Sequence, residues 1–243
     1  MRILIIRHGD PDYPNDSLTP KGQREAELVA DRLAREDIHH FFVSPLGRAR
    51  ATAAPTLCRF GQEAEVCTWL QEFPPLIVKP DQPLEQTITW DWLPADWTVV
   101  PEFYHPELWM ETEVMRAGRV KEAYAEVAAG LDEILSRFGY RREGNFYRVE
   151  KPCRKTIALF CHFGLECVLL SHLFHVSPMV LWHGTALATT SVTTLYSEER
   201  RPGVALFRAL SIGDLSHLYA AGEKPSFSAR FCETYDDWTE RHD

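Results

Sequence analysis

The sequence lacks the features of a disulfide-rich secreted protein, a zinc protein or a membrane protein. Its six cysteines form no CxxC pair and show no zinc-ligand spacing. No apolar run approaches the roughly 20 residues that cross a membrane. Only four apolar residues separate Arg2 from Arg7, too few for a signal peptide. We therefore expect a cytoplasmic protein in which all six cysteines are reduced thiols: Cys58, Cys67, Cys153, Cys161, Cys167 and Cys232.

The chain is also poor in positive charge. Its 26 Lys and Arg stand against 35 Asp and Glu, which gives a formal net charge of -9. This sign argues against nucleic acid or an anionic membrane surface as the main partner. It does not exclude a phosphorylated substrate. Salt screens distant charges beyond about 8 Å, whereas one arginine about 4 Å from a phosphate contributes roughly 4 kcal/mol. With 243 residues and no visible repeat, the chain fits one domain or one domain with an excursion.

Short apolar runs alternate with amphipathic stretches along most of the chain. The run at 3–6 has no polar alternation, which is typical of a strand buried on both faces of a parallel sheet. Thr19 and Pro20 predict the N-cap and first position of a helix, and Ser44-Pro45 predicts the same for a helix over 46–60. This order predicts an α/β fold with a mainly parallel sheet. The later elements that the pattern predicts are strands near 41–43, 64–67, 156–161, 191–196 and 204–210, and helices near 113–138 and 165–174.

Residues 74–112 interrupt this rhythm. They hold seven of the 16 prolines and four of the seven tryptophans, and from Asp81 to Glu113 there are eight carboxylates and no lysine or arginine. A loop of this length in a compact domain is usually a functional lid or a disordered linker. Disordered segments are poor in aromatic residues, so we expect an ordered insertion that acts as a lid.

Three segments suited to binding phosphate follow predicted strands. Arg7-His8-Gly9 ends the first strand, Arg48 lies in the first turn of the helix after the second, and His162 ends a later strand before a helix start. Histidine can attack phosphorus, and arginine matches phosphate oxygens with a fork of donors. The carboxyl ends of parallel strands meet at one edge of a sheet, so these side chains are expected to converge. The alternative is that Arg7 and His8 merely end a strand at the surface.

Five motifs occur together in one order. They are Arg7-His8-Gly9, the stretch 18–22 (LTPKG), the stretch 44–53 (SPLGRARATA), Leu70-Gln71-Glu72 and His162-Phe163-Gly164. In this order the sequence resembles the histidine phosphatase superfamily, which includes the cofactor-dependent phosphoglycerate mutases. The resemblance implies a phosphoglycerate mutase-like fold, with helices on both faces of the sheet. It also implies one histidine phosphatase domain over 1–243, in which the insertion 74–112 is a lid.

The resemblance implies a role for each matching residue. His8 would be the nucleophile and become phosphohistidine, Arg7 and Arg48 would bind the phosphoryl oxygens, and His162 would donate a further hydrogen bond to them. Glu72 would protonate the leaving oxygen, although Asp10, Glu85 or another carboxylate of the insertion could be the acid instead. No metal or other cofactor is expected. The residues expected to bind the rest of the substrate are Gly9, Asn15, Trp90, Trp92, Phe163 and Gly164.

Two departures favour hydrolysis over mutase chemistry. The connection from Asp10 to Ser17 is short, and Phe73-Pro74-Pro75 stands after Glu72 where mutases of the family carry basic residues. We therefore expect a metal-independent phosphomonoester hydrolase of the histidine acid phosphatase type, acting on a small phosphorylated metabolite of low remaining charge. A phosphoglycerate mutase-type phosphotransferase and a non-catalytic phosphate-binding scaffold remain as alternatives. The oligomeric state, including a homodimer, is left open.

Overall fold

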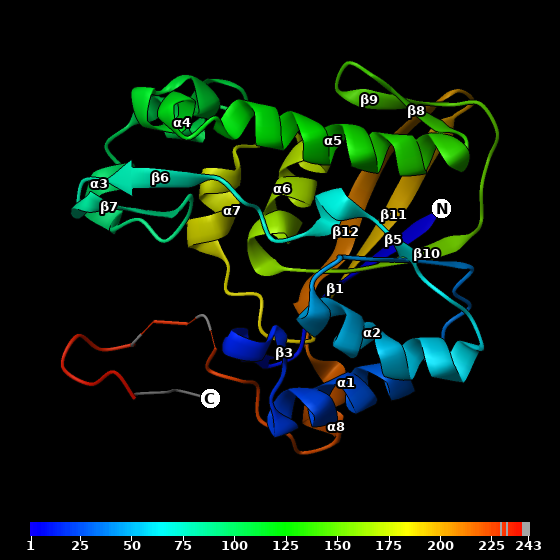
Figure 1. Ribbon diagram of the computed structural model, residues 1–243. Helices are drawn as coiled ribbons and strands as arrows, with labels where there is room; N and C mark the ends of the chain where they lie inside the picture. Colours follow the sequence, from blue (N-terminus) through cyan, green and yellow to red (C-terminus); the bar gives the residue numbers. More distant parts are fainter. Residues whose placement is uncertain (229, 232, 240–243) are drawn as a thin grey trace.

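The computed structural model describes residues 1–228, 230–231 and 233–239, so the expectation for Cys232 lies outside the described residues. The fold is built on an eight-stranded mixed sheet (Figure 1). Across the sheet the strands are β5 (Glu65–Val66), β4 (His40–Val43), β10 (Thr156–Cys161), β1 (Arg2–Arg7), β11 (Val192–Arg201), β12 (Val204–Asp214), β9 (Phe146–Val149) and β8 (Tyr140–Glu143).

The sheet has a parallel half and an antiparallel half. β1 pairs in parallel with β10, β10 with β4, and β4 with β5. On its other side β1 pairs antiparallel with β11, and β12 and β9 continue in that sense. β11 and β12 form a hairpin through Pro202 and Gly203, and the two strands of a hairpin are necessarily antiparallel. The predicted α/β class is confirmed, and the parallel arrangement holds for the four strands from β5 to β1.

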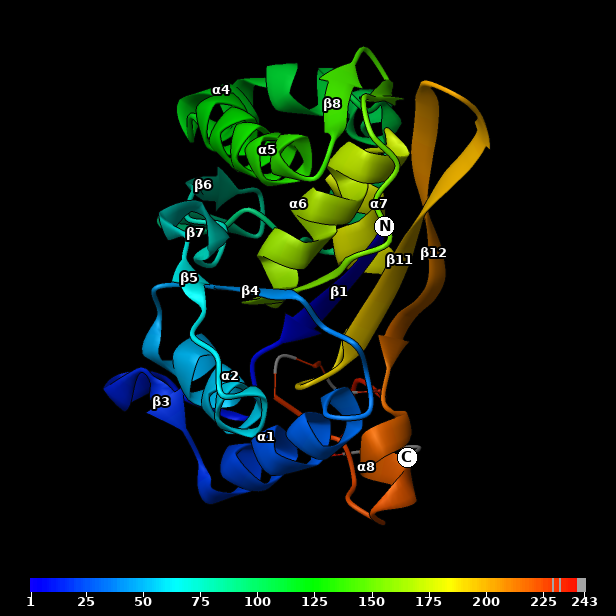
Figure 2. The ribbon, with the colours of Figure 1, turned by 90° about the vertical axis from the view of Figure 1, so that its right-hand side faces the viewer.

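Helices cover both faces of the sheet. Alternate residues of β1 point to opposite faces: Leu4 and Ile6 pack in one hydrophobic cluster with Val29 and Ala53, while Ile3 and Ile5 belong to a second, larger one. In Figures 1 and 2 one group of helices, on the side of Leu4, lies below the sheet, and a second group, on the side of Ile3, lies above it. The first group is α1 (Pro20–Leu33), α2 (Gly47–Phe60) and α8 (Ser216–Ala220); the second is α4 (Glu113–Ala117), α5 (Val120–Arg137), α6 (Phe163–Phe174) and α7 (Pro178–Gly184).

The starts of α1 and α2 differ from each other. The Thr19 hydroxyl accepts a hydrogen bond from Gly22 N at 3.1 Å, which confirms the predicted cap of α1. The predicted cap of α2 was wrong. Leu46 is the N-cap, and the carboxylate of Asp16 accepts from Gly47 N at 2.6 Å. The Ser44 hydroxyl contacts His162, a residue 118 positions later, and accepts from Leu46 N outside the helix.

The insertion at 74–112 is ordered and contributes to the main core. Its Trp90, Trp92, Phe103 and Trp109 are buried in the same hydrophobic cluster as the inner face of α5. These residues therefore belong to the body of the molecule, whereas a lid movement of this segment stays a prediction. Its elements are a hairpin of β6 (Leu76–Lys79) and β7 (Gln82–Ile88), helix α3 (Pro94–Trp97) and short 3-10 helices at Pro101–Tyr104 and Leu108–Glu111.

The predicted helix over 113–138 is two helices, α4 and α5, separated at Gly118. A Cβ atom at Gly118 would lie 2.6 Å from Ile77 Cγ2, so the close packing of the insertion explains the glycine there. A smaller hairpin of β2 (Pro11–Asp12) and β3 (Ser17–Leu18) follows β1. Within the described residues, none of the helices combines the length and the apolar character needed to span a bilayer.

Candidate active site

The two predicted site histidines follow neighbouring parallel strands. Arg7 ends β1 opposite Cys161, the end of β10, so the next residues, His8 and His162, come out at the same edge of the sheet. Their ring centroids lie 5.1 Å apart, with the ring planes inclined at 56°. Only 3% of Arg7, 2% of His8 and none of His162 is exposed. These buried polar residues form one cluster and do not simply end strands at the surface.

The surroundings of His8 fix its tautomer. Its Nδ1 lies 2.8 Å from the carbonyl oxygen of Gly9. A carbonyl can only accept, so Nδ1 carries the hydrogen and Nε2 keeps its lone pair. Burial, with the positive charges of Arg7 and Arg48, lowers the pKa of His8 well below that of a free imidazole. His8 is therefore neutral at neutral pH, with an unprotonated nitrogen available for nucleophilic attack.

The second histidine is held by a serine. The Ser44 hydroxyl lies 2.7 Å from His162 Nε2 and accepts a hydrogen bond from Leu46 N at 3.2 Å. His162 Nδ1 is buried and has no hydrogen-bond partner in the described part of the chain. Burial and the nearby His8, Arg48 and Arg7 lower the pKa of His162 well below its ordinary value. With Ser44 donating to Nε2, Nδ1–H is left as a donor for a ligand.

Two guanidinium groups stand beside these rings. Arg7 donates from Nη1 to the carbonyl of Leu187, and its Cζ lies 5.7 Å from the ring centroid of Phe163. Arg48 donates from Nη1 to the carboxylate of Asp16 at 2.7 Å. In both arginines Nε is buried without a partner among the residues described. Leaving such donors unpaired costs about 1–3 kcal/mol each, and the oxygens of a bound phosphoryl group could satisfy them.

Glu72 contacts the first turn of α6. Its Oε1 accepts hydrogen bonds from Phe73 N at 2.9 Å and from Leu165 N at 3.0 Å. Burial raises the pKa of Glu72 above its ordinary value, although these two N–H groups and the positive charges of Arg7 and Arg48 oppose the change. A carboxyl group with a raised pKa, one oxygen of which is fixed, is suited to carry a proton on the other oxygen. Asp10, the alternative acid, is used differently: its carboxylate accepts from Thr19 Oγ1 at 2.6 Å.

Gly9 and Gly164 allow the close approach of other groups at the site. A Cβ atom at Gly9 would lie 2.8 Å from the carbonyl oxygen of Gly22. One at Gly164 would lie 2.5 Å from Trp90 Cη2 and 2.9 Å from Glu72 Oε1. Trp90 is therefore packed directly against the start of α6, next to Glu72, and its contact with a substrate stays a prediction.

Two predicted substrate-binding residues make other contacts. Asn15 lies exposed on the 3-10 helix Tyr13–Asn15, and its amide donates to Asp12 at 2.8 Å. Trp92 is buried, and its indole N–H donates to the carbonyl of Thr89 at 2.8 Å. No hydrogen bond or ring contact joins either residue to the histidine cluster within the described ranges, so their roles stay predictions.

Several residues around the cluster were assigned no role from the sequence. The Thr52 hydroxyl accepts from Gly9 N at 2.9 Å, and Glu25 Oε2 accepts from Asp10 N at 2.8 Å. Asp16 and Ser44 hold Arg48 and His162, as described above. Each of these contacts joins segments that are distant in sequence, so local patterns do not reveal them. Their only signal in the sequence is a small polar or acidic residue close to a predicted phosphate-binding motif.

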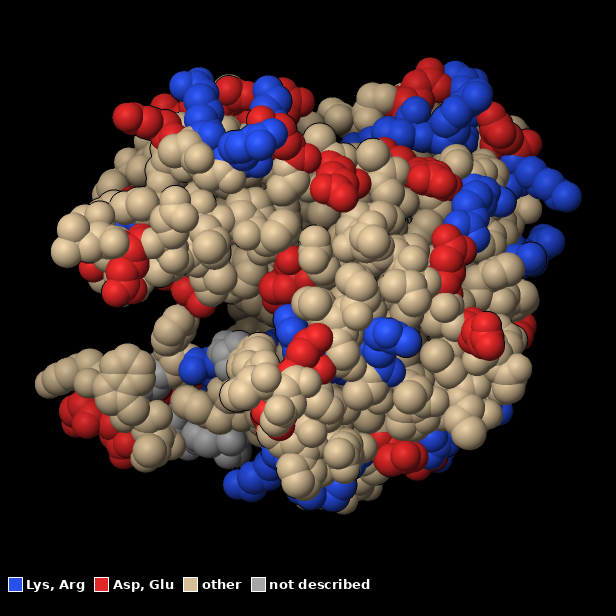
Figure 3. All heavy atoms as spheres, in the orientation of Figure 1, with Lys and Arg blue, Asp and Glu red and all other residues tan. Residues whose placement is uncertain are grey.

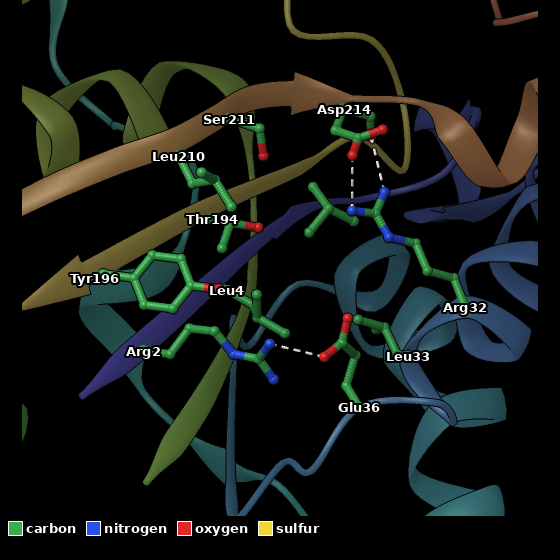
Figure 4. Close-up of a pocket in the computed structure, with 11 residues that line it drawn as sticks. Arg2, Leu4, Arg32, Leu33, Glu36, Thr194, Tyr196, Leu210, Ser211 and Asp214 are labelled. Carbon is green, nitrogen blue, oxygen red and sulfur yellow. Dashed lines mark hydrogen bonds and ion pairs between the residues drawn. The ribbon is translucent and has the colours of Figure 1, made fainter. Parts of the chain in front are cut away.

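Two further features place the cluster in the molecule. Figure 3 shows a hollow between the insertion and the C-terminal segment, on the side toward which β1 runs, with Asp and Glu side chains on the insertion side of this hollow. A separate pocket of about 150 Å³ lies at the opposite end of β1, lined by Arg2, Arg32 and Asp214 among others (Figure 4).

Among the described residues, no group of three His, Cys, Asp or Glu side chains is arranged to hold a metal ion.

Comparisons with known proteins identify the fold and the family. An alignment over 62 residues, which covers 22% of this chain and 29% of the other protein, shows 36% identity to the Probable phosphoglycerate mutase GpmB of Serratia proteamaculans. Two solved structures share the fold across most of both chains. A mutant phosphoserine phosphatase of Entamoeba histolytica has a TM-score of 0.57 and 17% identity, and covers 89% of this chain and 98% of its own. A mycobacterial glucosyl-3-phosphoglycerate phosphatase has a TM-score of 0.53 and 20% identity, and covers 87% and 98%.

A family model covers most of the chain. The model of the histidine phosphatase superfamily (branch 1) matches residues 3–209. This range includes all five motifs, both strands that carry the site histidines, and the insertion. The chain therefore belongs to the histidine phosphatase superfamily.

Proposed function

We propose that the protein is a phosphomonoester hydrolase that acts through a phosphohistidine at His8. The observation that carries the proposal is the arrangement around this ring. Its Nδ1 is committed to the Gly9 carbonyl, its Nε2 is unprotonated, and the neighbouring Arg7, Arg48 and His162 each keep a buried N–H without a partner in the described structure. This combination suits in-line attack on a phosphoryl group whose three outer oxygens are held by donors.

The proposed reaction has two steps, and neither uses a metal ion. In the first, His8 Nε2 attacks phosphorus while the bond to the ester oxygen breaks, and Glu72 transfers its proton to that leaving oxygen. In the second, water attacks phosphorus and the bond to His8 breaks. Glu72 takes a proton from this water, and inorganic phosphate leaves. Arg7, Arg48 and His162 stabilise the negative charge on the phosphoryl oxygens throughout.

The chemistry requires two protonation states at once. His8 must be neutral to attack, and Glu72 must be protonated to donate. Burial lowers the pKa of His8 and raises the pKa of Glu72, so both groups are moved toward their working forms. We expect a bell-shaped pH profile on the acidic side of neutrality, which is the behaviour of an acid phosphatase.

Hydrolysis is favoured over mutase chemistry by what surrounds the site. A mutase must retain its phosphorylated intermediate and a charged substrate until the phosphoryl group is returned. Between Asp81 and Glu113 the insertion has no lysine or arginine, and Phe73-Pro74-Pro75 follows Glu72. The relative in Serratia proteamaculans, named as a mutase, matches only 22% of this chain. A non-catalytic scaffold is disfavoured because His8, Arg7, Arg48 and His162 are all present and close together.

The substrate we propose is a small phosphomonoester with little charge besides its phosphate. The carboxylates of the insertion would repel a polyanion at the mouth of the site. Trp90, packed against Gly164 next to Glu72, is the aromatic side chain that we propose for contact with an apolar or planar leaving group. We further propose that the protein works in the cytoplasm with reduced thiols; the five described cysteines are unbonded.

The test is a screen of phosphomonoesters with phosphate release as the readout and His8→Ala as the control. We expect release from several small esters by the native enzyme, none above background by His8→Ala, and weak activity on phytate or polyphosphate. Transfer to a phosphoglycerate in place of water would instead identify a mutase. Absence of both hydrolysis and transfer across the panel would identify a scaffold.

A further inference from the structure

A buried carboxyl group lies directly behind the peptide that holds the His8 imidazole. Glu25, on α1, is fully buried, and its Oε2 accepts a hydrogen bond from Asp10 N at 2.8 Å. The carbonyl of the same peptide group, that of Gly9, accepts from His8 Nδ1 at 2.8 Å. The C=O and N–H of a trans peptide point in opposite directions. Glu25 and His8 therefore lie at opposite edges of one rigid peptide group, which joins them.

We propose that Glu25 is a positioning residue that sets the orientation and tautomer of His8 through the Gly9–Asp10 peptide. Accepting a hydrogen bond from Asp10 N polarises this peptide and increases the negative charge on the Gly9 carbonyl oxygen. That oxygen then holds His8 Nδ1–H more firmly, which keeps the lone pair on Nε2 and aims it at the phosphoryl group. The inference rests on the proposed phosphohistidine chemistry and adds a residue to which the sequence analysis assigned no role.

The packing of α1 makes this contact rigid. A Cβ atom at Gly22 would lie 2.2 Å from the carbonyl oxygen of Asp10, so the first turn of α1 is pressed against the segment after His8. That same carbonyl accepts from Thr19 N at 3.0 Å. Glu25 follows Gly22 by about one helical turn, on the same face of α1. The fold thus fixes the distance between Glu25 and the peptide, and the two cannot separate without moving α1.

The preceding peptide is fixed as well. Gly9 N donates to Thr52 Oγ1 at 2.9 Å, and the carbonyl of His8 accepts from Thr190 N at 3.2 Å. Both peptide groups that flank Gly9 therefore have their N–H and C=O engaged. Of the two, only the Gly9–Asp10 peptide also contacts the His8 side chain. Glu25 is the group that accepts a hydrogen bond from the N–H of this peptide.

The environment of Glu25 is costly for a residue with only a structural role. Its Oε1 makes no hydrogen bond in the described structure, and the Lys21 ammonium is 3.9 Å away. Burial raises the pKa of Glu25, while the Thr189 hydroxyl, Asp10 N–H and Lys21 act in the other direction. A buried carboxyl group with such incomplete pairing disfavours folding. A role in orienting the nucleophile accounts for its presence at this position.

Two substitutions separate the acceptor from the rest of the side chain. Glu25→Gln keeps an oxygen that can accept from Asp10 N, whereas Glu25→Ala removes it. We expect Glu25→Ala to lower kcat about 10- to 100-fold with KM within about twofold, because misplacing a reacting group by a small distance has effects of this size. We expect Glu25→Gln to retain kcat within about threefold. Leu33→Val, at the far end of α1, is the control for general loosening of this helix.

The readout that a merely structural residue would not change is the state of the His8 ring. In ¹⁵N NMR spectra of the phosphate-free protein, we expect Nδ1–H and a bare Nε2 for the native protein, Glu25→Gln and Leu33→Val. We expect a mixture of tautomers for Glu25→Ala. A native-like His8 signature in folded Glu25→Ala, or equal losses of kcat in Glu25→Ala and Leu33→Val, would overturn the proposal. If the native protein hydrolyses no phosphomonoester, the proposed function fails, while the spectra alone still decide whether Glu25 sets the His8 tautomer.

Discussion

The two ends of strand β1 each carry an arginine, and the two arginines differ in their burial and in their ion pairs. At the amino end, Arg2 pairs with Glu36 at 2.8 Å and Arg32 pairs with Asp214 at 3.0 Å, around the pocket shown in Figure 4. At the carboxyl end, Arg7 is almost fully buried, and no ion pair joins it to a carboxylate in the described structure. Its Nε has no hydrogen-bond partner in that part of the chain either.

This difference separates structural charge from functional charge. Partly exposed ion pairs such as Arg2–Glu36 contribute little to stability, and the charge of Arg2 is already paired. A buried guanidinium without a carboxylate is unfavourable for folding, and it is retained where an anionic ligand supplies the missing partner. The pocket of about 150 Å³ lies at the Arg2 end, whereas the chemistry that we propose lies at the Arg7 end.

The sharpest test of this comparison removes each arginine in turn. We expect Arg7→Met to lower kcat/KM for a phosphomonoester by about 1,000-fold or more, which is the size of effect that an arginine at a transferring phosphoryl group has. We expect Arg2→Met to leave kcat/KM within about twofold and to change stability by no more than about 1 kcal/mol. Similar kinetic losses in the two variants would show that the ends of β1 do not differ as described.

The second test concerns the carboxyl group at the Arg7 end. Glu72→Gln removes the proposed proton donor, so we expect a loss of about 100-fold or more in kcat for an alkyl phosphate. The leaving group of 4-nitrophenyl phosphate needs no proton. For this ester, the factor by which the rate of phosphoenzyme formation falls should be at least tenfold smaller. Equal losses for both esters, measured as single-turnover rates, would assign the acid to another group.

The same variant tests the pH profile. The pKa of Glu72 is raised by burial, and the protonated form is the one that we propose as the proton donor. Activity should therefore fall as pH rises through that pKa, and this alkaline limb should be absent in Glu72→Gln. The acidic limb should remain, because it reports the protonation of His8. Activity of the native enzyme that rises steadily into alkali would contradict these assignments.

A third test uses a second buried carboxyl group near Arg7. Glu166 is fully buried, and burial raises its pKa to about 8, although the Thr193 side chain and the positive charge of Arg7 oppose the change. Between a pKa of about 4.5 in the unfolded chain and 8 in the folded one, only the folded state holds the proton. This contribution to stability is complete below pH 4.5 and is lost as pH rises to 8. We expect Glu166→Gln to be more stable than the native protein by about 2–4 kcal/mol at pH 8.

The check is urea denaturation at two pH values. At pH 5 the difference between Glu166→Gln and the native protein should fall to about 1 kcal/mol or less, because the folded proteins are then neutral at this position and the unfolded chain is only partly ionised. An equal difference at pH 5 and pH 8 would show that Glu166 ionises as freely in the folded state as in the unfolded one.

The smallest expected effect concerns a hydroxyl group at each end of the same sheet. Ser44 contacts His162 Nε2, whereas Thr156 Oγ1 accepts from Arg2 Nε at 3.2 Å. One hydrogen bond contributes about 0.5–1.5 kcal/mol. We therefore expect Ser44→Ala to lower kcat/KM by about 3- to 10-fold and Thr156→Val to leave it unchanged. If Thr156→Val has the larger kinetic effect, the comparison between the two ends is wrong.

The sequence predicted most of the elements because their signals are local. The buried run of β1 and the Thr19 cap of α1 depend only on neighbouring residues. The approach of His8 and His162 could be expected because parallel strands place their carboxyl ends together. The role of Ser44 could not be predicted, because Ser-Pro before a helix is an ordinary cap signal and only the folded sheet brings His162 beside it.

Two other features could not be predicted from local patterns: the packing of the insertion in the main core and the contact of Glu25 with the peptide after His8. The tryptophans at 90–109 predicted an ordered segment, but not that it would share the core of α5. Glu25 lies on the buried face of α1, where its spacing matches that of apolar neighbours. Its contact with Asp10 N depends on the close packing of Gly22 against the loop after His8. No periodic pattern in the sequence predicts this packing.

The central claim is that the phosphoryl group is carried by His8, and the most direct measurement is to trap it there. The native protein is mixed with a ³²P-labelled phosphomonoester, stopped within milliseconds in alkali, and digested for peptide mapping. We predict a label on the peptide containing His8 that survives alkali, is lost in acid and is absent from His8→Ala. A label that survives acid, or one that persists in His8→Ala, would contradict the account.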